Sequence, residues 1–222
     1  MQGADPGFEI EAGVLRPTEV TALGDALGAV ESRSRAGARH LMSHPAVMKM
    51  ANDPRLLRLA QEWLGSKPIP YRATLFDKSP ASNWLVVWHQ DTALPLRLRR
   101  DVPGWGPWSV KAGVVYAHAP ASALETVIAL RVHLDDSTSE NGPLRVLPST
   151  HRAGVLSDER IHDLVSRTGP LECVVGCGGV ILMRPLLVHA SSKSKTIAPR
   201  RVLHIEYAAS LQVGSNLELN VA

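Results

Sequence analysis

Cysteine is scarce in this 222-residue sequence, which contains only Cys173 and Cys177. Their four-residue spacing matches neither a CxxC redox pair nor half of a convincing zinc site. The low count therefore excludes a disulfide scaffold and a thiolate zinc centre. We predict two free thiols, the usual state in a reducing cytosol.

Long apolar runs are also missing. No stretch approaches the roughly 18 apolar residues that a membrane-spanning helix needs. The N-terminal segment MQGADPGFEIEAG carries acidic residues and no apolar core, which excludes a secretory signal peptide. We therefore expect a soluble, cytoplasmic protein that does not bind membranes.

A strong excess of either charge is absent, since the formal net charge is +3 and the basic residues are scattered. The densest basic cluster is Arg97, Arg99 and Arg100, followed at once by Asp101. A nucleic-acid-binding protein usually shows a broader basic stripe, so no nucleic-acid partner is expected. The cluster fits a solvated loop face, and the alternative is a basic mouth that attracts an anionic substrate.

Glycine (17 residues) and proline (16) are plentiful, and the apolar runs between them are short, which favours strands and turns over a helical bundle. We find no internal repeat, low-complexity segment or linker. The sequence therefore predicts a single domain over residues 1–222, with a mainly helical part at 1–66 and a β core at 67–210.

The first third of the chain has helical periodicity. Apolar residues at a spacing near 3.6 predict a helix from Pro17 to about Arg35, stopping at Gly37. A second helix is expected over Pro45 to Ala51. Asp53 followed by Pro54 predicts the start of a third, which ends at Gly65.

After Gly65 the pattern changes to short segments rich in Val, Ile and Leu, separated by turn residues. One surface helix, Ser157–Val165, interrupts them. The predicted strands are Ile69–Phe76, Trp84–Trp88, Val110–Tyr116, Val127–Leu134, Leu171–Val175, Val180–Met183 and Val202–Ala208. Helices followed by seven or eight short strands indicate a mainly β fold, a jelly-roll-like double sheet with helices packed outside it.

The strongest local signal for chemistry is Trp88-His89-Gln90-Asp91. Residues i and i+2 of a strand point to the same face, so His89 and Asp91 can meet one ion. An imidazole and a carboxylate are two members of the 2-His-1-carboxylate triad that binds non-haem Fe(II). The motif alone is weak, because a core histidine beside a surface aspartate is the ordinary explanation of such a tripeptide.

A third ligand is available in His189, at the end of the apolar run LLVH. His118, His133, His151 and His204 compete with it, since each lies in or near a predicted strand. Arg200, eleven residues after His189, favours His189. The distal carboxylate of 2-oxoglutarate needs a permanently charged, bidentate partner, which arginine supplies better than lysine.

Three stretches together resemble the phytanoyl-CoA dioxygenase family: LFDKSPASNWLVVWHQDTALPL, HLDDSTSENGPLRVLPSTHR and MRPLLVHASSKSKTIAPRRVLHIEYA. The resemblance covers roughly Tyr71 to Ala208. It implies a double-stranded β-helix, a cupin-like barrel, with Fe(II), 2-oxoglutarate and O2. It also implies that His89, Asp91 and His189 hold the metal.

The same resemblance assigns Arg200 to the co-substrate and suggests that Ser191 helps to bind the same carboxylate. Related halogenases lack the carboxylate of the triad. Since Asp91 is present, the resemblance implies hydroxylation rather than halogenation.

Further residues are candidates for the pocket. Thr126 and Arg131 lie on or just before a predicted inner strand, and Lys78 and Gln90 are possible contacts for 2-oxoglutarate or substrate. Gln90, however, is expected to point away from the face that His89 and Asp91 share. Trp105 and Trp108, in the segment PGWGPW, could form a lid over the substrate or anchor a long loop in the core.

These residues predict a dioxygenase that oxidises a C–H bond of a small molecule and releases succinate and CO2. Some relatives close rings, desaturate or epimerise, so the outcome of the reaction stays open. Two other classes remain. One is a cupin-type metalloenzyme that does not use 2-oxoglutarate, which succinate formation would distinguish. The other is a non-catalytic, ligand-binding barrel, which the intact set of His89, Asp91, His189 and Arg200 disfavours.

Overall fold

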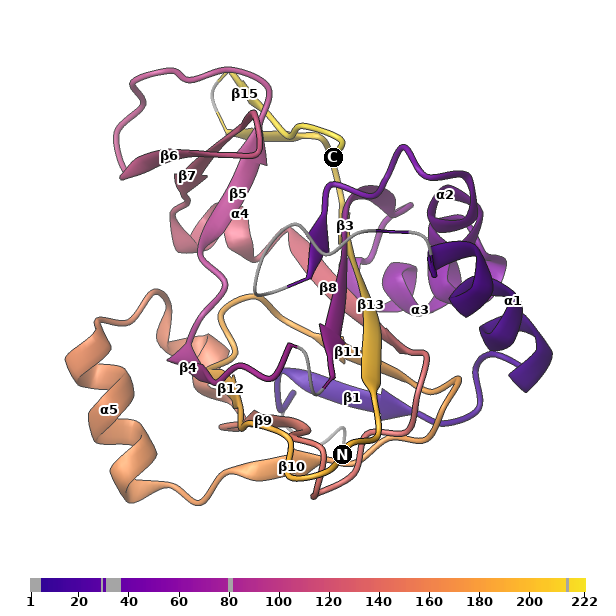
Figure 1. Cartoon of the computed structure of the whole chain (residues 1–222). Helices are drawn as coiled ribbons and strands as arrows, with labels where there is room; N and C mark the ends of the chain where they lie inside the picture. The colour runs from indigo at the N-terminus through magenta and orange to yellow at the C-terminus, as the bar shows by residue number, and fades with distance from the viewer. Residues whose placement is uncertain (1–4, 29, 31–36, 80–81, 215) are drawn as a thin grey trace.

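The computed structural model describes residues 5–28, 30, 37–79, 82–214 and 216–222. It is a mainly antiparallel β structure with helices on its outside (Figure 1), as the sequence predicted. Two sheets, which we call the major and the minor sheet, form the jelly roll. None of the helices in this described part of the chain is long and apolar enough to cross a membrane.

The major sheet has six strands, all paired antiparallel. In spatial order they are β1 (Phe8–Glu11), β11 (Val180–Met183), β8 (Val127–His133), β13 (Arg200–Ala208), β3 (Ile69–Lys78) and β2 (Ala38–Arg39). The first 66 residues thus supply both edge strands of this sheet, in addition to helices. Its longest strands are β3 and β13, which pair with each other and contribute buried residues to the core.

The minor sheet has four short strands. In spatial order they are β10 (Leu171–Cys173), β9 (Leu144–Val146), β12 (His189–Ser191) and β4 (Val86–His89). A separate three-stranded sheet and a hairpin lie together near the top of Figure 1. They comprise β5 (Ala93–Leu96), β7 (Val114–His118) and β6 (Trp108–Lys111), and then β14 (Gln212–Gly214) and β15 (Leu217–Glu218).

The helices occupy three regions of the surface. α1 (Pro17–Leu27), α2 (Pro45–Ala51) and α3 (Pro54–Leu64) cover one face of the major sheet (Figure 1). α5 (Asp158–Arg167) lies beside the minor sheet, and two short segments complete the set: α4 (Ala121–Leu124) and the 3-10 turn η1 (Thr150–Ala153).

The two faces of β13 show why the sheet packs as it does. Leu203, Ile205 and Tyr207 point outward into a core shared with α1, α2 and α3. The alternate residues of the strand, among them Arg200 and His204, are therefore turned inward, because successive side chains of a strand alternate between faces. The register pairs Arg200 with Lys78, and His204 with both Thr74 and Arg131, so the inner face collects polar side chains.

Helix boundaries were largely predictable. α1 begins at Pro17 as expected, but it ends at Leu27 rather than near Arg35, with Gly28 as its cap. Residues 29 and 31–35 of that prediction lie outside the described residues. α2 matches its predicted range. α3 begins after Asp53, whose side chain accepts a hydrogen bond from the backbone N–H of Arg55, and ends at the left-handed Gly65.

One predicted strand is wrong. Val110–Tyr116 is not a single strand but the hairpin of β6 and β7, which turns at Ala112 and Gly113. Both turn residues have positive φ, 48° and 82°, as a tight hairpin turn requires. The apolar residues on either side of this turn gave the appearance of a continuous run.

Several strands were not predicted because they are too short to show a period. β1, β2, β5, β9, β12 and the β14–β15 hairpin are each two to four residues long. Such segments become strands because a longer partner is available beside them. The two cysteines are both free thiols, as predicted, with Cys173 buried and Cys177 exposed.

Candidate metal and co-substrate site

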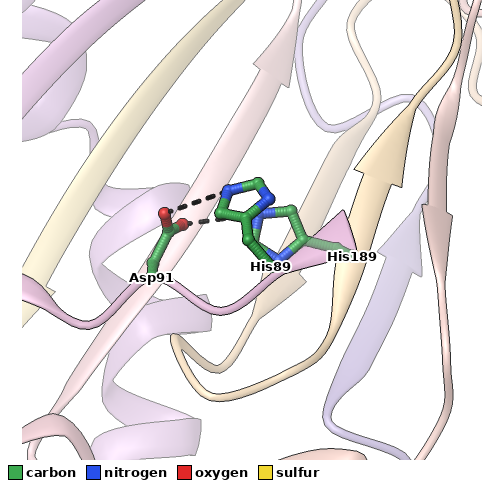
Figure 2. A group of neighbouring side chains, drawn as sticks. All are labelled: His89, Asp91 and His189. Atoms are coloured by element: carbon green, nitrogen blue, oxygen red, sulfur yellow. Dashed lines mark ion pairs between the residues drawn. The ribbon is translucent and has the colours of Figure 1, made fainter. Parts of the chain in front are cut away.

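Three candidate ligands meet where the strands β4 and β12 pair. His89 is the last residue of β4, and His189, the first residue of β12, lies directly opposite it. Their imidazole centroids are 4.2 Å apart. The carboxylate of Asp91 lies 3.6 Å from the Nε2 atom of each ring, as Figure 2 shows. Cross-strand pairing therefore brings together residues that are 100 positions apart in the sequence.

Both imidazoles are oriented by the backbone. The Nδ1 atom of His89 lies 2.8 Å from the carbonyl oxygen of Val87, and that of His189 lies 2.8 Å from the carbonyl oxygen of Leu187. Carbonyl oxygens only accept hydrogen bonds, so each Nδ1 carries the proton. Each Nε2 lone pair is then free and faces Asp91, which is how metal-binding histidines are commonly held.

The charge states of Asp91 and His189 also suit a cation. Burial opposes ionisation of Asp91, but His189 and His89 together hold the pKa of this carboxyl well below its usual range. Burial and the nearby His89 lower the pKa of His189 to about 4, so this imidazole is neutral at pH 7. Burial lowers the pKa of His89 as well, but the hydrogen bond and charge of Asp91 outweigh it and leave that pKa raised.

These side chains fit a divalent metal ion. One nitrogen from each histidine and one Asp91 oxygen lie within 4.8 Å of one another. They were the one such cluster found among the described residues. Two imidazoles and one carboxylate, with no thiolate, match the donor set of non-haem Fe(II) sites and leave coordination positions open.

A cavity of about 430 Å³ extends from this group to Arg200. We call it the arginine cavity, and its boundary includes His89, Asp91, His189, Ser191 and Arg200. Arg200 is 4% exposed and donates hydrogen bonds to the Ser191 hydroxyl and the Asn141 carbonyl, both at 3.3 Å. The predicted metal ligands thus border one space with Arg200 and Ser191, two of the residues predicted to bind the co-substrate.

Lys78 adds a second buried cation at this end. It lies opposite Arg200 on the neighbouring strand, and its ammonium group donates to the Ser191 hydroxyl at 2.8 Å and to the Ser192 carbonyl. The Ser191 hydroxyl itself donates to the carbonyl of Gly142 at 2.8 Å. Burial, and then the charges of Arg200, Arg131 and Arg145, lower the pKa of Lys78 to about 7.

Arg131 is the third cation. It is 8% exposed on β8, lies 5.3 Å from the ring centre of Phe76, and approaches the Nδ1 atom of His204 at 3.3 Å. Burial lowers the pKa of Arg131 and of Arg200 to about 10. No ion pair joins Lys78, Arg131 or Arg200 to a carboxylate within the described ranges. A buried group of cations without a counter-ion suits a ligand that carries carboxylates.

Gln90 lies beside the candidate metal group, and its amide is bound to the backbone. Its amide nitrogen donates to the carbonyls of Gly154 and Leu186, and its amide oxygen accepts from the backbone N–H of Leu156. Each polar atom of the side chain is therefore bound to the backbone. Gln90 holds the loop before His189 close to the end of β4, and it borders a second cavity beside Asp91.

The structure places Thr126 outside the cavities described here, which corrects the expectation that it faces the pocket. It is exposed, and its hydroxyl donates to the carbonyl of Ala123 at 2.7 Å. The reason is the short helix α4, which was not predicted. Thr126 forms the turn between α4 and β8, so it precedes the strand whose inner face borders the site.

The tryptophans of the PGWGPW segment favour the anchoring alternative. Trp105 and Trp108 are partly buried against a core cluster that includes Leu94, Leu96 and Ala117. Neither residue borders the arginine cavity. Of the competing histidines, His204 borders it, whereas His133 is buried and His151 lies 3.7 Å from Asp5.

A second cavity, of about 270 Å³, lies on the other side of Asp91. We call it the basic cavity, because its boundary includes Arg39, Arg72 and Lys111 around Tyr116. His89, Asp91, Phe76, His204 and Arg39 border both cavities, so the two spaces meet at the candidate metal group. Sequence reasoning had not singled out Arg39, Arg72, Lys111 or Tyr116.

Comparison with known proteins finds a proline hydroxylase and ectoine dioxygenases among the relatives of this chain. The chain is 24% identical over 185 residues to L-proline trans-4-hydroxylase of Streptomyces griseoviridis, covering 72% of this chain and 61% of that protein. It is 23% identical over 235 residues to the ectoine dioxygenase of Halomonas elongata, covering 87% and 64%. The chain thus spans less than two thirds of the length of these relatives.

Solved structures share the fold. EctD of S. alaskensis with 2-oxoglutarate and 5-hydroxyectoine superposes with a TM-score of 0.68 at 20% identity, over 92% of this chain and 72% of that one. The epimerase SnoN in complex with Fe3+, alpha ketoglutarate and nogalamycin RO gives 0.71 at 18% identity, over 93% and 80%. The family model for phytanoyl-CoA dioxygenase (PhyH) matches residues 7–202. The chain therefore belongs to the phytanoyl-CoA dioxygenase (PhyH) family.

Proposed function

We propose that this protein is a non-haem Fe(II)- and 2-oxoglutarate-dependent dioxygenase that hydroxylates a C–H bond of a small molecule. The observation that carries the proposal is the convergence of His89, Asp91 and His189 at one end of a cavity whose other end is lined by buried, unpaired cations. Family membership and the names of the relatives, a proline hydroxylase and an ectoine dioxygenase, support the reaction class.

The chain would contribute geometry rather than the oxidising power. His89, Asp91 and His189 would hold Fe(II) from one side, because their Nε2 and carboxylate atoms share one face. When bound, Fe(II) supplies the activation of O2, with 2-oxoglutarate as the reductant that is converted to succinate and CO2. Related halogenases lack the carboxylate of the triad, so the presence of Asp91 favours hydroxylation over halogenation.

The co-substrate would lie in the arginine cavity. Its distal carboxylate would accept from Arg200, with Ser191 and Lys78 completing the charged end. Arg131, on the neighbouring strand of the major sheet, borders the same cavity and adds positive charge to it. Apolar side chains such as Phe76, Leu144 and Val86 line the walls and would limit the access of water.

Anaerobic reconstitution tests the proposal without a known substrate. The metal-free protein is loaded with Fe(II), 2-oxoglutarate is added, and the weak visible charge-transfer band is recorded. We expect the band in the wild type, none in His189→Ala, and a weaker band in Arg200→Ala at the same 2-oxoglutarate concentration. Arg201→Ala is the matched control, because this adjacent arginine pairs with Asp135 instead of lining the cavity.

Folded, iron-loaded wild-type protein without the band would contradict the use of 2-oxoglutarate. Iron binding without the band would indicate a cupin-type metalloenzyme that does not use 2-oxoglutarate. Failure to bind iron at all would indicate a barrel that only binds a ligand. Arg201→Ala weakening the band as much as Arg200→Ala would remove the assigned role of Arg200.

A further inference from the structure

The basic cavity carries positive charge to which the proposed iron and 2-oxoglutarate chemistry gives no role. Its cationic side chains come from three separate elements: Arg39 from β2, Arg72 from β3 and Lys111 from the end of β6. Asp91 is the one acidic residue on its boundary, and that carboxylate already faces His89 and His189. The cavity therefore has more positive than negative charge.

Arg72 is neutralised inside the protein. Its guanidinium forms a two-point ion pair with Glu206 on the neighbouring strand, with Nη2 donating at 2.6 Å, and its Nη1 donates to the carbonyl of Ala93 at 3.3 Å. Arg72 therefore borders the cavity, but its charge is balanced by Glu206. The two remaining cations, Arg39 and Lys111, have no ion pair with any acid among the residues that the structure describes.

Tyr116 sets the position of these charges. Its ring lies below the Lys111 ammonium group, 4.9 Å from the ring centre, and also contacts the Arg72 guanidinium at 5.5 Å. Its hydroxyl lies 2.8 Å from the Nε2 atom of His40. The tyrosine is 2% exposed, so it is a fixed platform between the β6–β7 hairpin and the major sheet.

Lys111 and Arg39 lie close enough to repel each other. Partial burial lowers the pKa of Lys111, and the charges of Arg39 and Arg72 lower it further. Like charges directed at one cavity are unfavourable unless a ligand supplies the opposite charge. A volume of about 270 Å³ is at the small end of ligand pockets and suits a compact molecule.

We infer that the substrate is a small organic anion, whose charged group binds between Arg39 and Lys111 while its carbon skeleton extends over Tyr116 toward Asp91. This inference rests on the proposed function for the reaction, but the anion site itself is a property of Arg39, Lys111 and Tyr116. Because Arg39 and Lys111 bind the charged group, an uncharged part of the molecule would lie next to the candidate metal group. The basic residues thereby select both the class of substrate and its orientation.

The test uses matched probes that differ in charge and share one skeleton. Cyclohexanecarboxylate is compared with cyclohexanecarboxamide, and cyclohexyl phosphate with cyclohexanol, by titration calorimetry. The protein is held anaerobically with Fe(II) and saturating 2-oxoglutarate, so that the arginine cavity is occupied. We expect the anionic member of at least one pair to bind about tenfold or more tightly than its neutral partner.

The double variant Arg39→Gln, Lys111→Gln should abolish this preference. Lys111→Gln alone should weaken the preference and leave the visible band unchanged, because Lys111 borders the basic cavity and not the arginine cavity. The matched control of the double variant is Lys67→Gln, Arg152→Gln, which removes the same charge from exposed positions outside the cavities described here. Preference for the carboxylate pair or for the phosphate pair then identifies the kind of anion.

Three results would overturn the inference: equal binding of the anionic and neutral probes, no detectable binding of any anion, or an anion preference that survives in the double variant. The visible band is measured on the same samples and reports the proposed function. A missing band with an intact anion preference sinks that function alone, whereas a normal band without the preference sinks this inference alone.

Discussion

Lys78 is an unusual residue for a buried position, because burying an ammonium group without a carboxylate is unfavourable. It has no exposed surface, and its hydrogen-bond acceptors are the neutral oxygens of Ser191 and Ser192. The pKa of about 7 means that its charge changes near neutral pH. The strand pairing that places Lys78 opposite Arg200 explains the second cation at this end of the cavity.

The lowered pKa of Lys78 predicts a pH-dependent stability. Between pH 7 and 10.5 the unfolded chain binds a proton at this lysine and the folded chain does not, so this residue makes stability rise with pH in that window. Lys78→Met removes the effect. We expect the stability of Lys78→Met relative to wild type to fall by about 1 kcal/mol per pH unit as the pH rises through the window.

Urea unfolding of the metal-free proteins at a series of pH values measures this difference. Lys67→Met is the control for the residue type, because Lys67 is exposed. Parallel pH profiles for Lys78→Met and wild type would show that Lys78 does not have the lowered pKa.

At the scale of elements, the site depends on how a few loops approach the strands. The loop after β8 reaches the segment that follows His189 at Gly142, which has a φ of 69°. A Cβ atom there would lie 2.2 Å from the carbonyl oxygen of Ser192. That oxygen accepts from Lys78, and the carbonyl of Gly142 accepts from Ser191. Glycine is therefore required at position 142 for two reasons: the Ser192 carbonyl leaves no room for a Cβ atom, and the backbone has a positive φ.

Gly142→Ala should accordingly be destabilised by more than the ordinary strain of a non-glycine residue with positive φ. We expect a loss of about 3 kcal/mol or more of stability, together with weaker binding of 2-oxoglutarate, because the clash displaces Ser191 and Ser192. Gly65→Ala is the matched control. Gly65 has a φ of 67° but nothing within 4 Å of the added carbon, so about 1 kcal/mol is expected there.

Urea unfolding and titration with 2-oxoglutarate measure the two effects. Equal losses of stability in Gly142→Ala and Gly65→Ala, with unchanged affinity for the co-substrate, would show that the contact with Ser192 is not tight in solution.

At the scale of the whole molecule, the candidate ligands come from the minor sheet and the co-substrate cations from the major sheet. His89 and His189 belong to β4 and β12, whereas Lys78, Arg131 and Arg200 belong to β3, β8 and β13. A ligand that contacts both groups would therefore connect the two sheets. Unfolding would have to release it, so binding stabilises the folded state.

We expect Fe(II) with 2-oxoglutarate to raise the melting temperature of the anaerobic protein. At 100 times the dissociation constant, the gain is about 2.7 kcal/mol, or roughly 5–11 °C for a chain of this size. His189→Ala should lose most of this shift, and a chelator should reverse it in the wild type. A shift of the same size in His189→Ala would place the binding elsewhere.

The sequence by itself determined the classes of structure and the chemistry of the site. Helix starts at Pro17 and Pro54 followed from local capping rules, because proline and a capping aspartate act within one turn. The stretch His89-Gln90-Asp91, the distal His189 and Arg200 could be recognised together from their order along the chain. Local signals were sufficient here because each depends on neighbouring residues or on a specific motif.

Only the tertiary structure decided which side chains share a space. Thr126 was expected to face the pocket, but α4 places it in a turn outside the cavities described here. The backbone partners of the Gln90 amide could likewise be found only in the folded chain. The basic residues Arg39 and Lys111 stand 72 positions apart and meet through the packing of separate sheets. Strand register and long-range packing depend on the sum of many distant contacts, and no local pattern in the sequence records that sum.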